Sequence, residues 1–152
     1  MQKYNEVFML MAFDQAKIAK KLNEVPVGAV IVKDNKVVGK GYNKVIKDLN
    51  VASHAEINAI MNAGNFLQNF RLVGCHIYVT LEPCHMCAKA IVDARLDTVF
   101  FSTPEPKTGA IISIDNFFDQ GHLNHKVKFQ HGFYSKESAL MLKKFFKEKR
   151  GL

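Results

Sequence analysis

Two short segments of the chain carry side chains that commonly bind metal ions. The first is His54-Ala55-Glu56, and the second is Pro83-Cys84-His85-Met86-Cys87. Zinc binds imidazole nitrogen and thiolate sulfur, and a catalytic zinc site usually has three protein ligands and leaves the fourth position for water. His54, Cys84 and Cys87 provide such a set, because cysteines three positions apart lie on one face of a helix. The sequence therefore predicts one Zn²⁺ ion held by an imidazole and two sulfurs.

Glu56 lies two residues after His54, which places the pair at the start of a helix, with the carboxylate facing the metal-bound water. Zinc lowers the pKa of such a water from about 15.7 toward about 7, so that hydroxide is available at neutral pH. Glu56 can accept the proton and return it to a ring nitrogen and then to a leaving amine. This chemistry is hydrolytic deamination, and the two segments match the general signature of zinc deaminases that act on nucleobases.

Pro83 comes directly before the cysteines and is typical of a helix start. The unpaired N–H groups and the dipole of a helix N-terminus favour a thiolate over a thiol. We therefore expect both cysteines to be ionised before metal binds.

A structural zinc site is the alternative interpretation of the cysteine pair. Such sites normally close with four ligands, and the sequence offers no clear fourth. His85 lies between the cysteines and should point away from their shared face, while Cys75 and His76 precede an apolar strand and are interpreted as core or rim residues. The ligand set, its spacing and the adjacent Glu56 favour a catalytic site.

Length and composition predict one domain over residues 1–152, with 48% hydrophobic and 23% charged residues. The net charge of +7 indicates a polyanionic partner such as nucleic acid. Three cysteines, two of them assigned to metal, argue against a disulfide framework and fit a reducing cytoplasm. The apolar segment 7–13 is short and flanked by Glu6 and Asp14, so neither a signal peptide nor a membrane span is expected.

Hydrophobic periodicity and turn residues predict alternating helices and strands. The expected helices cover residues 4–22, 54–63, 84–94 and 135–150, and the expected strands cover residues 27–32, 37–42, 76–81, 98–102 and 127–130. Gly64 is expected to end the second helix, and the polar segment 43–53 to form a wall of the site. Residues 76–102 predict two parallel strands joined by a helix, so that both ligand segments meet at the carboxyl edge of the strands.

The expected C-terminal helix allows two interpretations. It places Leu140, Met141, Phe145 and Phe146 on one side and lysines around the rest. It is either a solvated helix docked on the core or a basic arm that contacts RNA phosphates, and the sequence leaves both open.

Longer stretches of the chain resemble the bacterial tRNA-specific adenosine deaminases, within the cytidine deaminase-like superfamily. The stretches are Glu24-Val25-Pro26-Val27-Gly28-Ala29, Gly41-Tyr42-Asn43, His54-Ala55-Glu56, the segment 78–88, Lys107-Thr108-Gly109 and Asn124-His125. The resemblance implies a three-layer α/β/α fold with a central five-stranded mixed sheet, a homodimer and one zinc ion per subunit. It also implies conversion of adenosine to inosine at the wobble position of a tRNA anticodon, usually that of an arginine tRNA.

The resemblance also assigns substrate-binding positions, which are Val27, Asn43, Ala55, Lys107, Thr108 and Asn124. Asn43 is expected to contact the flipped base, Val27 to wall the pocket, and the Lys107-Thr108-Gly109 loop to lie along the anticodon strand. Turn formation for Asn43 and core packing for Val27 are the alternatives. The chain departs from the family pattern in residues 48–53, at Lys89, at Glu105 and after Gly109, where residues 110–113 lack a further glycine.

Two alternative functions would use some of the same residues. A zinc deaminase of a free base or nucleoside, such as guanine or cytosine, would use the same metal ligands and Glu56. A noncatalytic RNA-binding protein with structural zinc is a further alternative, against which the carboxylate of Glu56 argues.

Overall fold

The computed structural model describes residues 2–151 of the chain. In chain order the elements of this range are α1 (Glu6–Lys21), β1 (Gly28–Lys33), β2 (Lys36–Tyr42), α2 (Val45–Asp48), α3 (Ala55–Leu67), β3 (Cys75–Leu81), α4 (His85–Asp93), β4 (Thr98–Thr103), the 3₁₀ helix η1 (Phe117–Asp119), β5 (Lys128–His131) and α5 (Ser135–Lys149). Each predicted helix and strand is present, whereas α2 and η1 were not predicted. None of the helices within the described residues is both long enough and apolar enough to cross a membrane.

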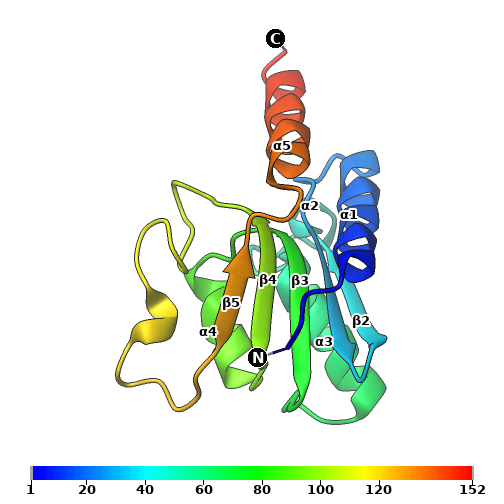
Figure 1. The fold of residues 1–152 in the computed structure, drawn as a ribbon. Helices are drawn as coiled ribbons and strands as arrows, with labels where there is room; N and C mark the ends of the chain where they lie inside the picture. The colour runs from blue at the N-terminus through cyan, green and yellow to red at the C-terminus, as the bar shows by residue number, and fades with distance from the viewer. Residues whose placement is uncertain (1, 152) are drawn as a thin grey trace.

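The strands of residues 2–151 form one five-stranded mixed sheet in the order β2-β1-β3-β4-β5 (Figure 1). β1 pairs antiparallel with both β2 and β3, while β3, β4 and β5 run parallel. Asp34 and Asn35 connect β1 to β2 with φ values of 50° and 62°. A two-residue turn with positive φ at both positions matches the twist of a hairpin, and Asp and Asn tolerate it well. The predicted hairpin and the predicted parallel pair are therefore confirmed.

Helices cover both faces of the sheet, which confirms the three-layer fold (Figure 1). Side chains alternate across the strands. Val30, Tyr78 and Phe100 point to one face, where they pack with the buried residues of α1. The intervening positions, among them Ile31, Ile77, Val79, Val99 and Phe101, point to the other face and pack with α3 and α4.

A glycine in β2 allows α3 to lie directly against the sheet. A Cβ atom added at Gly41 would be 2.3 Å from the carbonyl oxygen of Ala55 and 2.4 Å from the backbone nitrogen of Ala59. Both distances are far inside van der Waals contact, so only glycine leaves room for the first turns of α3. Because those turns carry Glu56, the contact helps to set the position of the site.

Two helices differ from the sequence prediction. α3 continues past Gly64 and ends at Leu67, with Gln68 at a φ of 54° as its cap. A glycine inside a helix costs about 1 kcal/mol relative to alanine, and the packing of Leu67 against the core offsets this cost. In α5 the predicted apolar face is wrong in part, since Leu140 is 67% exposed and Phe146 is 44% exposed. The helix buries Phe145, as predicted, together with Ser138, which was not predicted.

We expect Gly41→Ala to lower the free energy of unfolding by about 1–3 kcal/mol, because the new methyl group forces α3 away from the sheet. Urea denaturation followed by circular dichroism measures this change. Gly121→Ala is the matched control, since a Cβ atom there meets no atom within 4 Å. Equal stability of the two variants would contradict the close contact between β2 and α3.

Candidate functional site

The residues predicted to bind zinc lie at the beginnings of two helices. His54 is the N-cap of α3, Cys84 is the N-cap of α4, and Cys87 lies in the first turn of α4. The Nδ1 atom of His54 is 3.7 Å from the Sγ atom of Cys84 and 3.5 Å from the Sγ atom of Cys87. The structure thus brings all three side chains to one point at the carboxyl edge of β3.

The separation of the ligand atoms fits a zinc ion. Zn–N bonds of about 2.0–2.1 Å and Zn–S bonds of about 2.3 Å at a tetrahedral angle require an N···S distance of about 3.6 Å. The observed distances of 3.7 Å and 3.5 Å agree with this value. Among the described residues, His54, Cys84 and Cys87 form the one group of three or more His, Cys, Asp or Glu side chains close enough to share an ion. A set of three ligands suits a catalytic site better than a structural one.

The other candidate ligands lie apart from this group. The Nε2 atom of His85 is 2.8 Å from a carboxylate oxygen of Asp115 on the surface. Cys75 and His76 are buried at the beginning of β3, the end of the strand opposite Cys84. They occupy core positions, as their sequence context indicated.

The pKa values of Cys84 and Cys87 are shifted in opposite directions. A hydrogen bond between Cys87 and Cys84 lowers the pKa of Cys84 to about 4 and raises the pKa of Cys87. The low pKa of Cys84 agrees with the expected thiolate, whereas a second thiolate beside the first is unfavourable, which favours the protonated form of Cys87. A metal ion held by both sulfurs would require Cys87 to lose its proton as well.

Glu56 is a buried carboxyl beside the ligands, with 4% of its surface exposed. Burial raises its pKa to about 7, although its own backbone N–H and the nearby His54 act in the opposite direction. A carboxyl group that gains and loses a proton near neutral pH is suited to general acid–base catalysis.

A cavity of about 200 Å³ opens onto this group and is lined by Val25, Val27, Asn43, His54, Glu56, Leu81, Glu82, Cys84 and Thr108. Drug-sized ligands usually occupy about 300–1,000 Å³, so this cavity suits a single base. A larger and more open hollow of about 770 Å³ lies at the C-terminal end of α3. It contains none of the ligand residues.

The substrate positions taken from the family resemblance have different locations. Val27, Asn43 and Thr108 line the cavity. Ala55 is buried, and its backbone N–H donates to Oδ1 of Asn43 at 2.7 Å. Lys107 lies outside the cavity, in a groove beside α5. Asn124 is exposed and precedes His125, whose ring bonds to the Leu96 carbonyl at the opposite edge of the sheet, so the structure does not bring it to the cavity.

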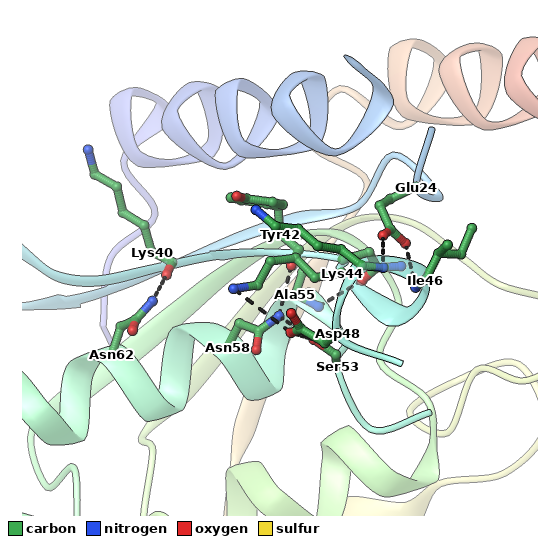
Figure 2. A network of polar contacts seen from close by, with 12 residues as sticks. Glu24, Lys40, Tyr42, Lys44, Ile46, Asp48, Ser53, Ala55, Asn58 and Asn62 are labelled. Atoms are coloured by element: carbon green, nitrogen blue, oxygen red, sulfur yellow. Dashed lines mark hydrogen bonds and ion pairs between the residues drawn. The ribbon is translucent and has the colours of Figure 1, made fainter. Parts of the chain in front are cut away.

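A polar network holds the 43–53 segment as one wall of the site (Figure 2). Asn58 of α3 donates to the carbonyl of Tyr42 and to the hydroxyl of Ser53, and Ser53 donates to Asp48. The carboxylate of Glu24 accepts the N–H groups at the start of α2, those of Ile46 and Lys47. The sequence prediction of a wall was correct in placing Asn43 at the cavity, but it missed α2 and the network behind it.

Known proteins similar to this chain are deaminases, which agrees with the chemistry of the site. Residues 3–150 match the family model described as MafB19-like deaminase. A tRNA-specific adenosine deaminase of Aquifex aeolicus (strain VF5) is 41% identical over 145 residues, which is 95% of each chain. The chain belongs to this deaminase family.

Solved structures extend the comparison. One, from biochemical and structural studies of A-to-I editing by tRNA:A34 deaminases at the wobble position of transfer RNA, is 39% identical with a TM-score of 0.88. The match covers 91% of this chain and 100% of the other. A guanine deaminase from Nitrosomonas europaea is 17% identical with a TM-score of 0.76, over 95% of this chain and 86% of its own. At that identity it shows a shared fold alone.

Three cavity residues of this deaminase were not assigned by the sequence analysis, which used Val25, Leu81 and Glu82 only as parts of family stretches or of an expected strand. Of these three, Glu82 is the charged one. Its carboxylate lines the cavity and accepts hydrogen bonds from the loop that carries Thr108. Burial acts to raise its pKa, but hydrogen bonds from Ser113, Ile112 and Glu105 outweigh burial and hold the pKa below its usual range. Its position directly before Pro83-Cys84 is the signal that could have found it.

We expect Cys87→Ala to lose most bound zinc, because two remaining ligands hold the ion far more weakly. Metal analysis of the purified protein by mass spectrometry gives the ratio of zinc to chain, with about one expected for the unaltered protein. Cys75→Ala is the control, since this buried cysteine lies at the far end of β3. Zinc retained by Cys87→Ala, or lost from Cys75→Ala, would contradict the ligand assignment.

Proposed function

We propose that this protein is a single-domain enzyme that hydrolyses adenosine to inosine at the wobble position of a tRNA anticodon, with an arginine tRNA as the expected substrate. The observation that carries the proposal is the buried Glu56 beside His54, Cys84 and Cys87 in a cavity of about 200 Å³. The likeness to tRNA-specific adenosine deaminases supports the choice of adenosine and of tRNA. It also argues against a noncatalytic RNA-binding protein.

The chain supplies the proton transfers of this reaction. A Zn²⁺ ion held by His54, Cys84 and Cys87 would act as a Lewis acid that makes a water molecule nucleophilic at neutral pH. Glu56 takes a proton from that water and delivers it to N1 of the adenine ring as oxygen bonds to C6. It then passes the second proton to the departing amine. Adenosine and water thus give inosine and ammonia.

The cavity walls suit an adenine that has left the base stack. Val27 offers an apolar surface, and Asn43 offers an amide. Because Oδ1 of Asn43 already accepts the N–H of Ala55, its NH₂ group is the part that can donate to an acceptor on the base. Base flipping is least unfavourable where bases are unpaired, as in an anticodon loop.

A groove beside the cavity supports contact between α5 and RNA. The groove has a volume of about 430 Å³ and is lined by Glu105, Lys107, Leu142, Lys143, Phe146 and Arg150. α5 extends beyond the carboxyl edge of the sheet, the edge where the metal ligands lie (Figure 1). Three cations and an exposed phenylalanine suit a phosphate backbone and an unstacked base. Of the two interpretations of α5, this arrangement favours the basic arm.

A homodimer in the cytoplasm completes the proposal. Ile46, Leu49 and Val51 expose 63%, 91% and 83% of their surfaces on the segment that forms one wall of the site. Exposed apolar side chains this close together in the sequence favour a protein interface, and a second copy of the chain would cover them. Free Cys75, Cys84 and Cys87 fit a reducing compartment.

We expect Glu56→Gln to keep about one zinc per chain and to lower kcat by about 10²–10⁴-fold, because the amide cannot accept a proton. The assay measures inosine formed in an arginine tRNA anticodon stem-loop by the zinc-loaded protein. Asp14→Asn, on the exposed side of α1, is the control and should retain the activity. Absence of inosine with the unaltered protein, together with turnover of free guanine or cytosine, would favour the free-base deaminase instead.

We expect the double variant Lys107→Ala and Lys143→Ala to raise KM for the stem-loop while leaving its zinc content unchanged. For each lysine that no longer neutralises a phosphate, the slope of log affinity against log salt should fall by about 0.7, the value for single strands. Affinity measured between about 50 and 200 mM salt gives this slope. Lys17→Ala on α1 is the control, and an unchanged slope in the double variant would exclude the groove from RNA binding.

A further inference from the structure

Glu82 is a buried carboxylate between β3 and the ligand Cys84. Its side chain is 2% exposed and lines the cavity beside Glu56 and Thr108. A carboxylate in this place has two possible roles. It either contacts the substrate or the reacting atoms, or it holds other parts of the site in position.

The hydrogen bonds of Glu82 decide between these roles. Oε2 accepts the N–H groups of Ile111, Ile112 and Ser113 at 2.9, 2.8 and 3.0 Å. Oε1 accepts the N–H of Glu105 at 3.0 Å and the hydroxyl of Ser113. A carboxylate has about four acceptor sites, so the 105–113 loop occupies them all. Glu82 therefore has no lone pair left for a substrate or for a proton in transfer.

The loop in turn depends on this carboxylate. Residues 104–116 contain neither an α-helix nor a strand, so their buried N–H groups need acceptors from elsewhere. Glu82 supplies one acceptor group for four of these N–H groups. Gly109 fits this arrangement, because a Cβ atom there would lie 2.3 Å from the carboxylate of Glu82.

The same loop is attached to the segment that bears a metal ligand. The N–H of Ala110 donates to the carbonyl of Pro83 at 2.9 Å, and Gly109 forms an isolated antiparallel bridge with Cys84. Thr108, the neighbour of Gly109, lines the cavity. Glu82 thus lies at the junction of the ligand segment and the loop that walls the substrate cavity.

We propose that Glu82 is a positioning residue for the deamination: it holds the 105–113 loop against the Cys84 segment so that Thr108 closes the cavity over the base. The expected changes in KM and kcat rest on the proposed function. The role of Glu82 in holding the 105–113 loop does not depend on any substrate. It also explains why residues 110–113 need no further glycine. Residues 111–113 bind Glu82 through backbone N–H groups, which any residue other than proline can supply. Ser113 adds its side-chain hydroxyl.

The test compares Glu82→Gln with the unaltered zinc-loaded protein. The amide offers one acceptor oxygen and turns an NH₂ group toward the remaining donors, so part of the loop loses its partner. We expect the amides of Glu105 and of residues 111–113 to exchange hydrogen at least tenfold faster while those of α1 stay protected. We expect KM for the stem-loop to rise about tenfold or more, kcat to change less than KM, and the pH profile of kcat to keep its shape.

Controls separate positioning from general damage. Asp93→Asn removes the same charge from an exposed side chain on α4 and should change none of these values. Should Glu82→Gln fail to fold, Ser113→Ala removes only the hydroxyl donor and should give the same pattern at a smaller size.

Two results would overturn the proposal. One is an unchanged exchange rate of the loop amides in Glu82→Gln. The other is a loss of kcat of a hundredfold or more with unchanged KM, unchanged zinc and an altered pH profile, which would make Glu82 a catalytic residue. Hydrogen exchange and zinc content need no substrate, so they test the role of Glu82 even if the unaltered protein forms no inosine.

Discussion

Two helices that begin at the same edge of the sheet determine where every part of this site can lie. His54 and Cys84 are the N-cap residues of α3 and α4, and neither side chain makes the usual capping hydrogen bond to its own helix. The imidazole and the sulfur turn toward each other instead. The helix ends keep their partial positive charge beside the sulfurs, which favours an anionic ligand set. The side chains that would ordinarily cap these helices instead form part of a group that could hold a metal ion.

Other segments of the chain bind at or just before the starts of these two helices. The N–H of Ala55 at the start of α3 is bound by Asn43 from the segment after β2. On the other side, Gly109 and Ala110 pair with Cys84 and Pro83 just before α4. Both of these segments are also walls of the cavity. One cavity wall thus supplies an acceptor to the first N–H group of α3, while the other wall is bound to the segment just before α4.

The sequence alone predicted the parts of this arrangement that depend on local chemistry. The positive φ values of Asp34 and Asn35 follow from a hairpin turn between apolar runs, and the ligand spacing of Cys84 and Cys87 follows from helix geometry. The end of α3 and the buried face of α5 could not be predicted in the same way. Leu67 carries α3 past Gly64, and Leu140 is left exposed. Both outcomes depend on tertiary packing against residues that are distant in the sequence.

The remote position of Asn124 and the role of Glu82 have a related explanation. A motif shows that residues occur together in a family but not which edge of the sheet each one occupies. The chain before β5 runs along the edge opposite the ligands, because β5 is parallel to β4 and its residue Lys128 pairs with Thr98. The position of Glu82 directly before Pro83-Cys84 marks it in the sequence, but its hydrogen-bond partners lie 23 to 31 positions away and cannot be read from the local sequence.

Irregular backbone beside a cavity needs acceptors that helices and sheets cannot provide. The two walls of this site solve the problem in the same way, with one buried carboxylate each. Glu24 accepts two N–H groups of the 43–53 segment, and Glu82 accepts four from the 105–113 loop. A carboxylate is efficient in this role because two oxygens on a single side chain serve several donors at once. Apart from Gly109, which has no room for a Cβ atom, and Ser113, whose hydroxyl donates to Glu82, the 105–113 loop is anchored to Glu82 through its backbone and not through its side chains.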